Sequence, residues 1–156
     1  WELTDAKARA LLETNLHGPI ATVAAVVPAL LAQGHGTIGL VSSVAGYGGL
    51  PKALVYGASK AALINFAETL YFDLRPRGLG VALVNPGFVK TPLTDRNAFR
   101  MPFLIEADEA AREIVAGLER GDFEIHFPRP FTRRMKLLNL LPYRWYFAAV
   151  RKATGL

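Results

Sequence analysis

Cysteine is absent from all 156 residues, which excludes disulfide bonds and thiolate-ligated metal sites. The absence fits a reducing compartment, and we expect the protein to be cytoplasmic. The hydrophobic fraction of 51% excludes a disordered chain. The length suits a single domain with one sizeable core.

An initiator methionine, an N-terminal leader and an uninterrupted apolar span of transmembrane length are missing too. The sequence begins at Trp1, and no basic-then-apolar segment stands before it. We therefore expect a piece of a longer protein, and we expect no helix that crosses a bilayer.

Acidic residues are missing from the C-terminal part of the chain. Residues 129–156 hold seven Lys or Arg and no Asp or Glu, whereas residues 1–128 hold 11 basic and 13 acidic residues. The net charge of +5 therefore describes a basic, aromatic tail on a near-neutral body. A nucleic-acid-binding protein would spread its basic charge over the folded body, so we expect no nucleic-acid partner.

Helical and strand patterns alternate along the body. Helices are predicted over 4–33, 54–74 and 107–120, and strands over 37–42, 81–84 and 123–127. This alternation is typical of an α/β fold, here a partial parallel sheet of about three strands with helices on both faces. One sheet edge would lack a partner strand, so we expect further chain or a partner molecule to cover it.

Tyr56 and Lys60 are four residues apart in the helix predicted over 54–74, so their side chains share one helix face. A phenol is a poor base at neutral pH because its ordinary pKa is about 10. A cation held nearby favours the phenolate form and makes the side chain usable for proton transfer. The same spacing also occurs by chance, as a surface lysine beside a half-buried tyrosine.

Two further polar residues are predicted near this pair. Ser43 follows the strand 37–42 at its carboxyl end, where open α/β sheets bind ligands, although a serine there can also simply cap a turn. Asn15 precedes Pro19 by four residues, and a proline can neither donate to the Asn15 carbonyl nor pack without clashing with it. The helix should kink there, and the freed carbonyl can hold an ordered water.

In order and spacing, these residues resemble the signature of the short-chain dehydrogenase/reductase family. The matching segments are NLHG at 15–18, VSSVAG at 41–46, YGASKAAL at 56–63 and NPGFVKT at 85–91. The resemblance implies a Rossmann-like fold. By this resemblance, residues 1–128 would be the catalytic half of the domain, and residues 129–156 would be an extension packed on the same domain.

The resemblance also implies an activity, the interconversion of a secondary alcohol and a ketone with NAD or NADP. Tyr56 would be the general acid/base. Lys60 would favour the phenolate form of Tyr56 and bind the nicotinamide ribose. Ser43 would polarise the oxygen of an apolar small-molecule substrate, and Asn15 would hold a water that links Lys60 to solvent.

Further residues are assigned to the cofactor by resemblance alone. Backbone at Pro86, Gly87 and Val89 would lie near the nicotinamide, and Thr91 would hydrogen-bond its carboxamide. The glycine-rich phosphate turn of the family has no counterpart in this sequence. If that half is truly missing from the protein, we expect no bound NAD or NADP.

Two other functions stay open. The chain could be a catalytically silent piece or oligomerisation module of the same family, or it could use the Tyr-Lys pair as an epimerase or dehydratase does. The helices over 4–33 and 54–74 resemble the pair through which the family forms dimers and tetramers. We therefore expect a homodimer or homotetramer.

The remaining features predict supporting roles. His17, His35 and His126 lack metal-ligand spacing, so we expect no metal. The loop 88–104 resembles the family's substrate lid. Its apolar side chains would line a pocket or form a satellite cluster, and they are Phe88, Leu93, Phe99, Met101 and Phe103.

The basic, aromatic tail fits either an amphipathic segment lying on anionic lipid or an arm packed over the pocket or a neighbouring subunit. We favour packing over membrane-surface contact, because the segment is short and its apolar residues suffice for a core.

Overall fold

The computed structural model describes residues 3–92, 94 and 101–155. Three parallel strands form its sheet, in the order β1 (Thr37–Val41), β2 (Gly80–Pro86) and β3 (Glu124–Phe127). The expected α/β class and the parallel three-stranded sheet are confirmed. Every strand bound lies within two residues of its predicted position.

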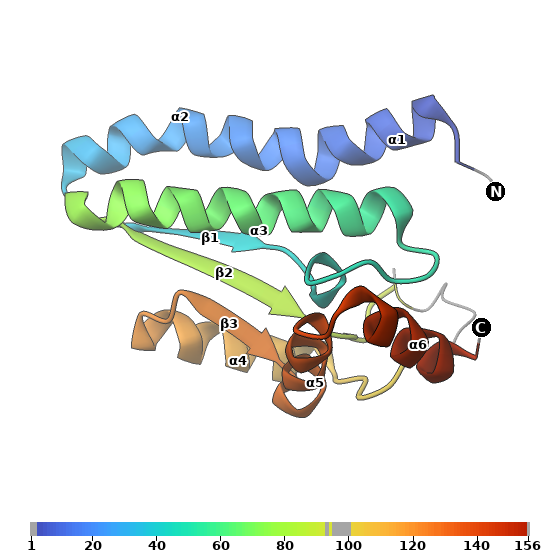
Figure 1. The fold of residues 1–156 in the computed structure, drawn as a ribbon. Helices are drawn as coiled ribbons and strands as arrows, with labels where there is room; N and C mark the ends of the chain where they lie inside the picture. Colours follow the sequence, from blue (N-terminus) through green and yellow to red (C-terminus); the bar gives the residue numbers. More distant parts are fainter. Residues whose placement is uncertain (1–2, 93, 95–100, 156) are drawn as a thin grey trace.

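The N-terminal helix is continuous, as Figure 1 shows, but it is not α-helical throughout. It consists of α1 (Asp5–Leu12), a π turn (Glu13–His17) and α2 (Gly18–Gln33), with the Thr4 side chain capping its start. Pro19 has no N–H to donate, and just before it the Gly18 N–H bonds instead to the Glu13 carbonyl, five residues back. The predicted kink is thus taken up as a π turn.

By length and composition alone, Asp5–Gln33 could cross a membrane, and it is the one helix in the described part of the chain that could. The expectation that no helix meets this criterion is therefore wrong, because the helix continues through both prolines. In this fold Leu16, Val23 and Leu30 pack into a core cluster with the first two strands. Val23 is the only buried side chain described in α1 and α2.

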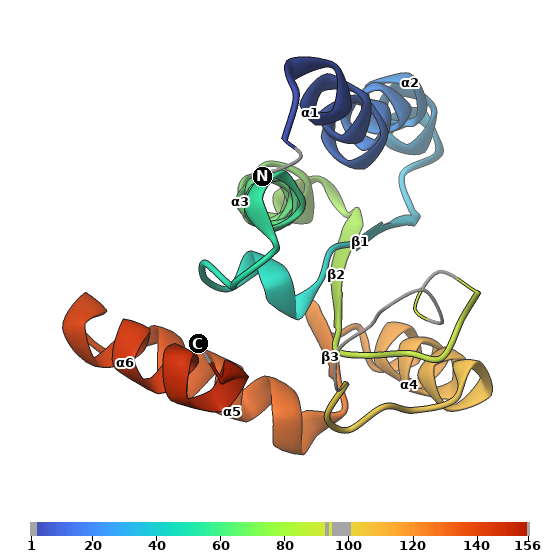
Figure 2. The same cartoon turned by 90° about the vertical axis from the view of Figure 1, so that its right-hand side faces the viewer.

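Helices cover both faces of the sheet (Figures 1 and 2). On one face lies α3 (Leu54–Leu74), with α1 and the π turn packed on it, and on the other lies α4 (Ala107–Arg120). Two core clusters correspond to these faces, one joining α3 to β1 and β2 and one joining α4 to β2 and β3. The outer side of α3 stays uncovered, since Phe72 is 75% exposed.

One edge of β1 has no partner among the described residues. The Ser42 N–H bonds to the Val84 carbonyl and the Gly36 carbonyl accepts from Gly80, so even-numbered residues turn their backbone groups toward β2. The groups of odd-numbered residues, including Val41, therefore face the open side. A cavity of about 500 Å³ lies between this edge and the helix Asp5–Gln33. The unpaired edge is thus at β1.

The tail forms two helices, α5 (Arg129–Asn139) and α6 (Tyr143–Thr154), beyond the carboxyl ends of the strands (Figure 1). Pro128 and Pro142 occupy the N-cap positions, and Pro130 lies in the first turn of α5. Proline is tolerated at such positions because the first helical N–H groups have no partner within the helix. Residues that resemble helix breakers in the sequence therefore begin helices here.

Candidate active site

The carboxyl end of β1 continues into a short turn that packs directly on α3. The Ser42 hydroxyl donates to the Lys60 carbonyl at 2.9 Å. The Ser43 hydroxyl accepts from the Ala45 N–H at 3.2 Å and caps the 3-10 turn Val44–Gly46. Ser43 therefore caps a turn, as one of the two interpretations of the sequence expected. Its O–H can still donate a hydrogen bond to a ligand.

Gly46 holds this turn against α3. A Cβ at Gly46 would lie 2.8 Å from the Lys60 carbonyl carbon and 2.7 Å from Ile64. No side chain fits there without moving the backbone of α3. The contact fixes the Lys60 region of the helix at the tip of β1.

Tyr56 and Lys60 point to the same side of α3, as their spacing predicts. The Lys60 ammonium lies 5.8 Å from the centre of the Tyr56 ring. Tyr56 is partly exposed, so its phenol can be reached from outside. The two groups therefore stand together at the edge of the fold, next to the turn that contains Ser43.

Lys60 has no acidic partner within the described residues. Its ammonium donates to the Val41 carbonyl at 2.9 Å, which is a carbonyl of the unpaired β1 edge. Burial lowers the pKa of Lys60, because a desolvated ammonium is less stable than a hydrated one. Lys60 also lines the cavity beside β1.

Asn15 reaches the same cavity from the π turn. Its side-chain amide donates to the Ser59 hydroxyl at 3.2 Å, and that hydroxyl donates to the Tyr56 carbonyl at 2.7 Å. Ser59 is fully buried. The structure thus connects Asn15 to the first turn of α3 through a side chain, in addition to the backbone role that the sequence suggested.

The residues after β2 lie on the tail side of the sheet. The Gly87 N–H bonds to the Phe127 carbonyl, and a Cβ at Gly87 would lie 2.8 Å from Phe131 of α5. Val89 forms an isolated parallel bridge with Ile105. Close approach by the tail is therefore one reason for glycine after Pro86.

Thr91 is held in a local turn. Its N–H donates to the Thr94 hydroxyl at 2.8 Å, and that hydroxyl also donates to the Val89 carbonyl at 2.7 Å. The nicotinamide contact assigned to Thr91 stays a prediction.

The loop after β2 packs on the tail. Phe88 and Phe103 lie 5.7 Å and 5.9 Å from the ring of Phe131, and the Arg134 guanidinium lies 5.2 Å from the ring of Phe103. These contacts match the satellite-cluster alternative. Leu93 and Phe99 lie outside the described residues.

A second polar cluster joins the same loops to the tail. Glu124 on β3 accepts from the Tyr47 hydroxyl at 2.6 Å and from the Asn85 amide at 2.9 Å, and it pairs with Lys136 of α5. Burial and the bond to Glu124 raise the pKa of Tyr47. Burial alone would raise the pKa of Glu124, but its bonds to Lys136, Tyr47 and Asn85 lower it overall.

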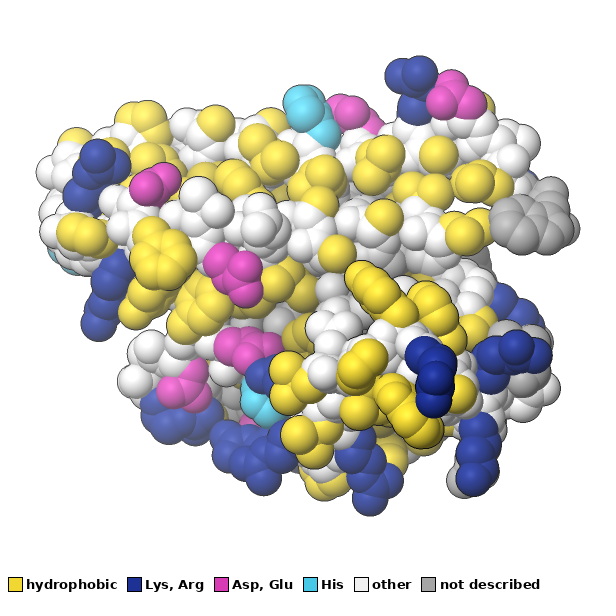
Figure 3. All heavy atoms as spheres, in the orientation of Figure 1, with side chains coloured by type: hydrophobic (Ala, Val, Ile, Leu, Met, Phe, Trp, Pro, Cys, Tyr) yellow, Lys and Arg dark blue, Asp and Glu magenta, His cyan; other side chains and the backbone are white. Residues whose placement is uncertain are grey.

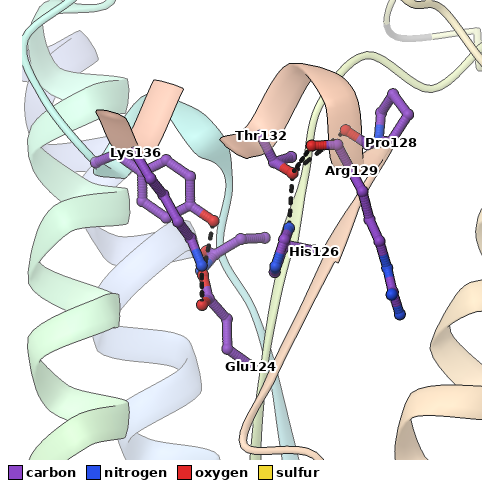
Figure 4. A network of polar contacts seen from close by, with 8 residues as sticks. Glu124, His126, Pro128, Arg129, Thr132 and Lys136 are labelled. Carbon is purple, nitrogen blue, oxygen red and sulfur yellow. Dashed lines mark hydrogen bonds and ion pairs between the residues drawn. The ribbon is translucent and has the colours of Figure 1, made fainter. Parts of the chain in front are cut away.

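His126 belongs to this cluster and not to a metal site. Figure 4 shows Lys136 pointing at Glu124 and Thr132 pointing at His126, as two neighbouring links between α5 and β3. Burial, reinforced by the nearby Lys136, lowers the pKa of His126. His17 pairs with Glu13 and His35 contacts Gln33. The described residues contain no group of three or more potential metal ligands.

Sequence reasoning missed Ser59, Tyr47, Glu124 and Lys136, because their partners are 12 to 77 residues away. The sequence contains a weak signal for the two contacts between β3 and α5. Glu124 and His126 share a strand face at spacing two, and Thr132 and Lys136 share a helix face at spacing four. Two short matching polar patterns in consecutive elements suggest facing surfaces.

Comparisons with known proteins agree with this arrangement. An uncharacterised oxidoreductase from Myxococcus xanthus is 40% identical over 97% of this chain and 58% of its own length. A short chain dehydrogenase from Burkholderia cenocepacia, solved with NADP, has a TM-score of 0.82 and 29% identity over 96% of this chain and 61% of its own. A homologue from Burkholderia phymatum, solved with NAD, has a TM-score of 0.77 and 25% identity over 88% of this chain and 59% of its own.

The chain thus spans about three fifths of the length of these proteins. The sequence model described as short chain dehydrogenase matches residues 1–100. That match covers the turn after β1, all of α3 and the end of β2. The chain belongs to the short-chain dehydrogenase family of oxidoreductases.

Proposed function

We propose that the protein of which this chain is part interconverts a secondary alcohol and a ketone with NAD or NADP, with Tyr56 as proton donor and acceptor. One observation supports this most strongly. A partly exposed phenol and a cation that has no acidic partner among the described residues share one helix face, at the tip of a parallel strand beside a serine hydroxyl. Ligands bind at this place in open α/β sheets.

The side chains divide the work of a carbonyl reduction. Ser43 donates a hydrogen bond from its O–H to the substrate oxygen and so orients that oxygen toward Tyr56. Tyr56 gives its phenolic proton to that oxygen, and in the oxidation it takes the proton back. Lys60 stabilises the phenolate that remains, because opposite charges attract strongly where water is scarce.

Asn15 supports the pair from the other side of the cavity. Its amide reaches α3 through Ser59, and it lines the same cavity as Lys60. A water in this polar part of the cavity would have the Asn15 and Lys60 side chains as partners. Such a water returns a proton from solvent toward Tyr56 by way of Lys60.

The residues present fit the ribose end of a nicotinamide cofactor. Lys60 is a partly desolvated donor that pairs with no carboxylate in the described part of the chain, and it lines an open cavity, so ribose hydroxyls can accept from it. Backbone at Pro86 and Gly87 and the side chain of Thr91 are the further candidates for contact. When bound, the nicotinamide supplies or accepts the hydride.

Additional chain completes the site at the β1 edge. A parallel strand placed there would offer an N–H to the Val41 carbonyl, which Lys60 now occupies. Pairing would release the ammonium toward the cofactor and fill part of the 500 Å³ cavity. On this view the 156 residues alone are silent, and activity requires the dinucleotide-binding half.

The test uses the intact protein, the two reduced cofactors and a panel of apolar ketones. Cofactor binding is followed by nicotinamide fluorescence and turnover by absorbance. We expect turnover that collapses about 10²- to 10⁴-fold in Tyr56→Phe, while cofactor binding is kept. Absence of cofactor binding by the intact wild type would favour a silent oligomerisation module.

A further inference from the structure

Exposed apolar side chains gather on the tail. Figure 3 shows yellow side chains over α5 and α6 with dark blue ones around and among them. The large apolar residues of segment 137–147 that remain exposed are Leu137, Leu140, Leu141, Tyr143, Trp145 and Phe147. Five of these side chains, all except Leu141, are more than half exposed. A patch of this kind on a folded protein marks a surface that binds something.

The tail is nevertheless fixed to the body. The Tyr146 hydroxyl donates to the Gly49 carbonyl at 2.8 Å, and Lys136 pairs with Glu124. Tyr146 and Val150 are the buried side chains of α6, and Thr132 is the one of α5. The tail therefore packs with one side only. The expectation that its apolar residues form a core holds for a few of them and not for the six exposed ones.

The charge of the tail limits what can cover the patch. All seven charged residues of 129–156 are basic, and of these seven only Lys136 has an acidic partner among the described residues. The exposed cations of the tail are Arg129, Arg133, Arg134, Arg144, Arg151 and Lys152. The occupant must therefore be both apolar and anionic.

We propose that α5 and α6 dock the protein on an anionic lipid bilayer. Tyr and Trp suit the headgroup boundary, leucine and phenylalanine side chains reach the acyl chains, and Arg and Lys contact anionic headgroups. A second copy of the tail would place one cationic surface against another. Nucleic acid would satisfy the cations but leave the exposed leucines in water.

The position of the tail agrees with docking. α5 and α6 lie toward β3, away from the unpaired edge of β1 (Figure 2). A strand added at β1 therefore leaves the patch free. The surface and the catalytic proposal depend on different residues, so each can fail without the other.

Co-sedimentation of the intact protein with vesicles tests the proposal. We expect binding to phosphatidylcholine vesicles with about 30% phosphatidylserine, and at least tenfold weaker binding to phosphatidylcholine alone. Raising NaCl from about 0.1 M to about 0.5 M should weaken the binding to the anionic vesicles several-fold.

Matched variants locate the surface. Arg144→Gln with Arg151→Gln should weaken vesicle binding about tenfold, whereas Arg75→Gln with Arg77→Gln, which removes the same charge at the far end of the strands, should not. Trp145→Ser should weaken it several-fold, and Phe72→Ser on α3 should not. All six positions are exposed, and circular dichroism verifies their folding.

Three results would overturn the proposal. One is no sedimentation above the vesicle-free control. Another is equal binding by the tail variants and their controls. The third is a combination of two observations: wild type does not bind vesicles, and a tail variant has a different molar mass from wild type in light scattering. That result would make the patch an interface between copies of the chain.

Discussion

The structure contains two tyrosine–lysine pairs, and only one of them suits proton transfer. The Lys60 ammonium lies 5.8 Å from the Tyr56 ring and the Lys136 ammonium lies 5.6 Å from the Tyr47 ring. The second pair is joined by Glu124, which accepts a hydrogen bond from the Tyr47 hydroxyl and forms an ion pair with Lys136. Burial and the hydrogen bond to Glu124 raise the pKa of Tyr47, so the proton stays on its phenol.

The first pair has no such acid among the described residues. Lys60 meets a neutral carbonyl, so its charge is not cancelled, and the Tyr56 phenol forms no hydrogen bond with a described side chain. Proximity of a cation to a phenol is therefore insufficient to define a catalytic pair. If the proposed function is correct, the presence or absence of a carboxylate separates a pair that transfers protons from one that stabilises the fold.

Replacing the lysine of each pair by methionine should separate the two pairs most clearly. Lys60→Met should lower the turnover of the intact enzyme by about 10²-fold or more, because the phenolate loses its counter-charge. Its free energy of unfolding should stay unchanged or rise slightly, since burial disfavours the ammonium. Turnover and urea unfolding measure the two effects.

Lys136→Met should show the reverse pattern. Removing the cation leaves Glu124 with one fewer partner and should lower the free energy of unfolding by about 1–2 kcal/mol. Turnover should change much less than in Lys60→Met. Equal losses of turnover in the two variants would remove the distinction between the pairs.

The glycine that fixes the first pair gives the next largest effect. Gly46→Ala would bring a methyl group within 3 Å of the α3 backbone, so it should lower the free energy of unfolding by about 1–3 kcal/mol. It should also lower turnover by displacing Lys60. Gly49→Ala is the matched control, because a Cβ there meets nothing within 4 Å. A silent Gly46→Ala would contradict the described contact.

The smallest effect concerns acid stability. The folded-state pKa of Glu124 lies below its unfolded value, so its stabilisation is complete above that value and is lost as the pH falls through the folded pKa. Between about pH 5 and pH 3, wild type should therefore lose about 1 kcal/mol more stability than Glu124→Gln. Thermal unfolding across this range measures the difference. If stability falls equally with pH in wild type and in Glu124→Gln, the Glu124 carboxylate contributes nothing to the free energy of unfolding in this range.

Local signals in the sequence predicted the elements that position the first pair. The bounds of α3 and α4 agree with the structure, because apolar periodicity and end signals such as Arg-Pro-Arg-Gly at 75–78 lie within the segments themselves. The shared face of Tyr56 and Lys60 follows from helix geometry alone. The parallel sheet follows from the alternation of elements.

The second pair could not be predicted in the same way. Tyr47, Glu124 and Lys136 come from a turn, a strand and the tail, and only the folded chain brings them together. Whether the Val41 carbonyl is free to accept from Lys60 also depends on which edge of β1 pairs with another strand. The helices that start after Pro128 and Pro142 were not predicted from the sequence, because proline was treated as an interruption.

One comparison of rates tests the central claim most directly. Turnover of the intact enzyme is measured for Tyr56→Phe and Tyr47→Phe under the same cofactor-saturated conditions. We predict that Tyr56→Phe loses at least 10²-fold while Tyr47→Phe stays within a few-fold of wild type. A Tyr56→Phe enzyme that turns over as fast as Tyr47→Phe would show that the proton comes from another group.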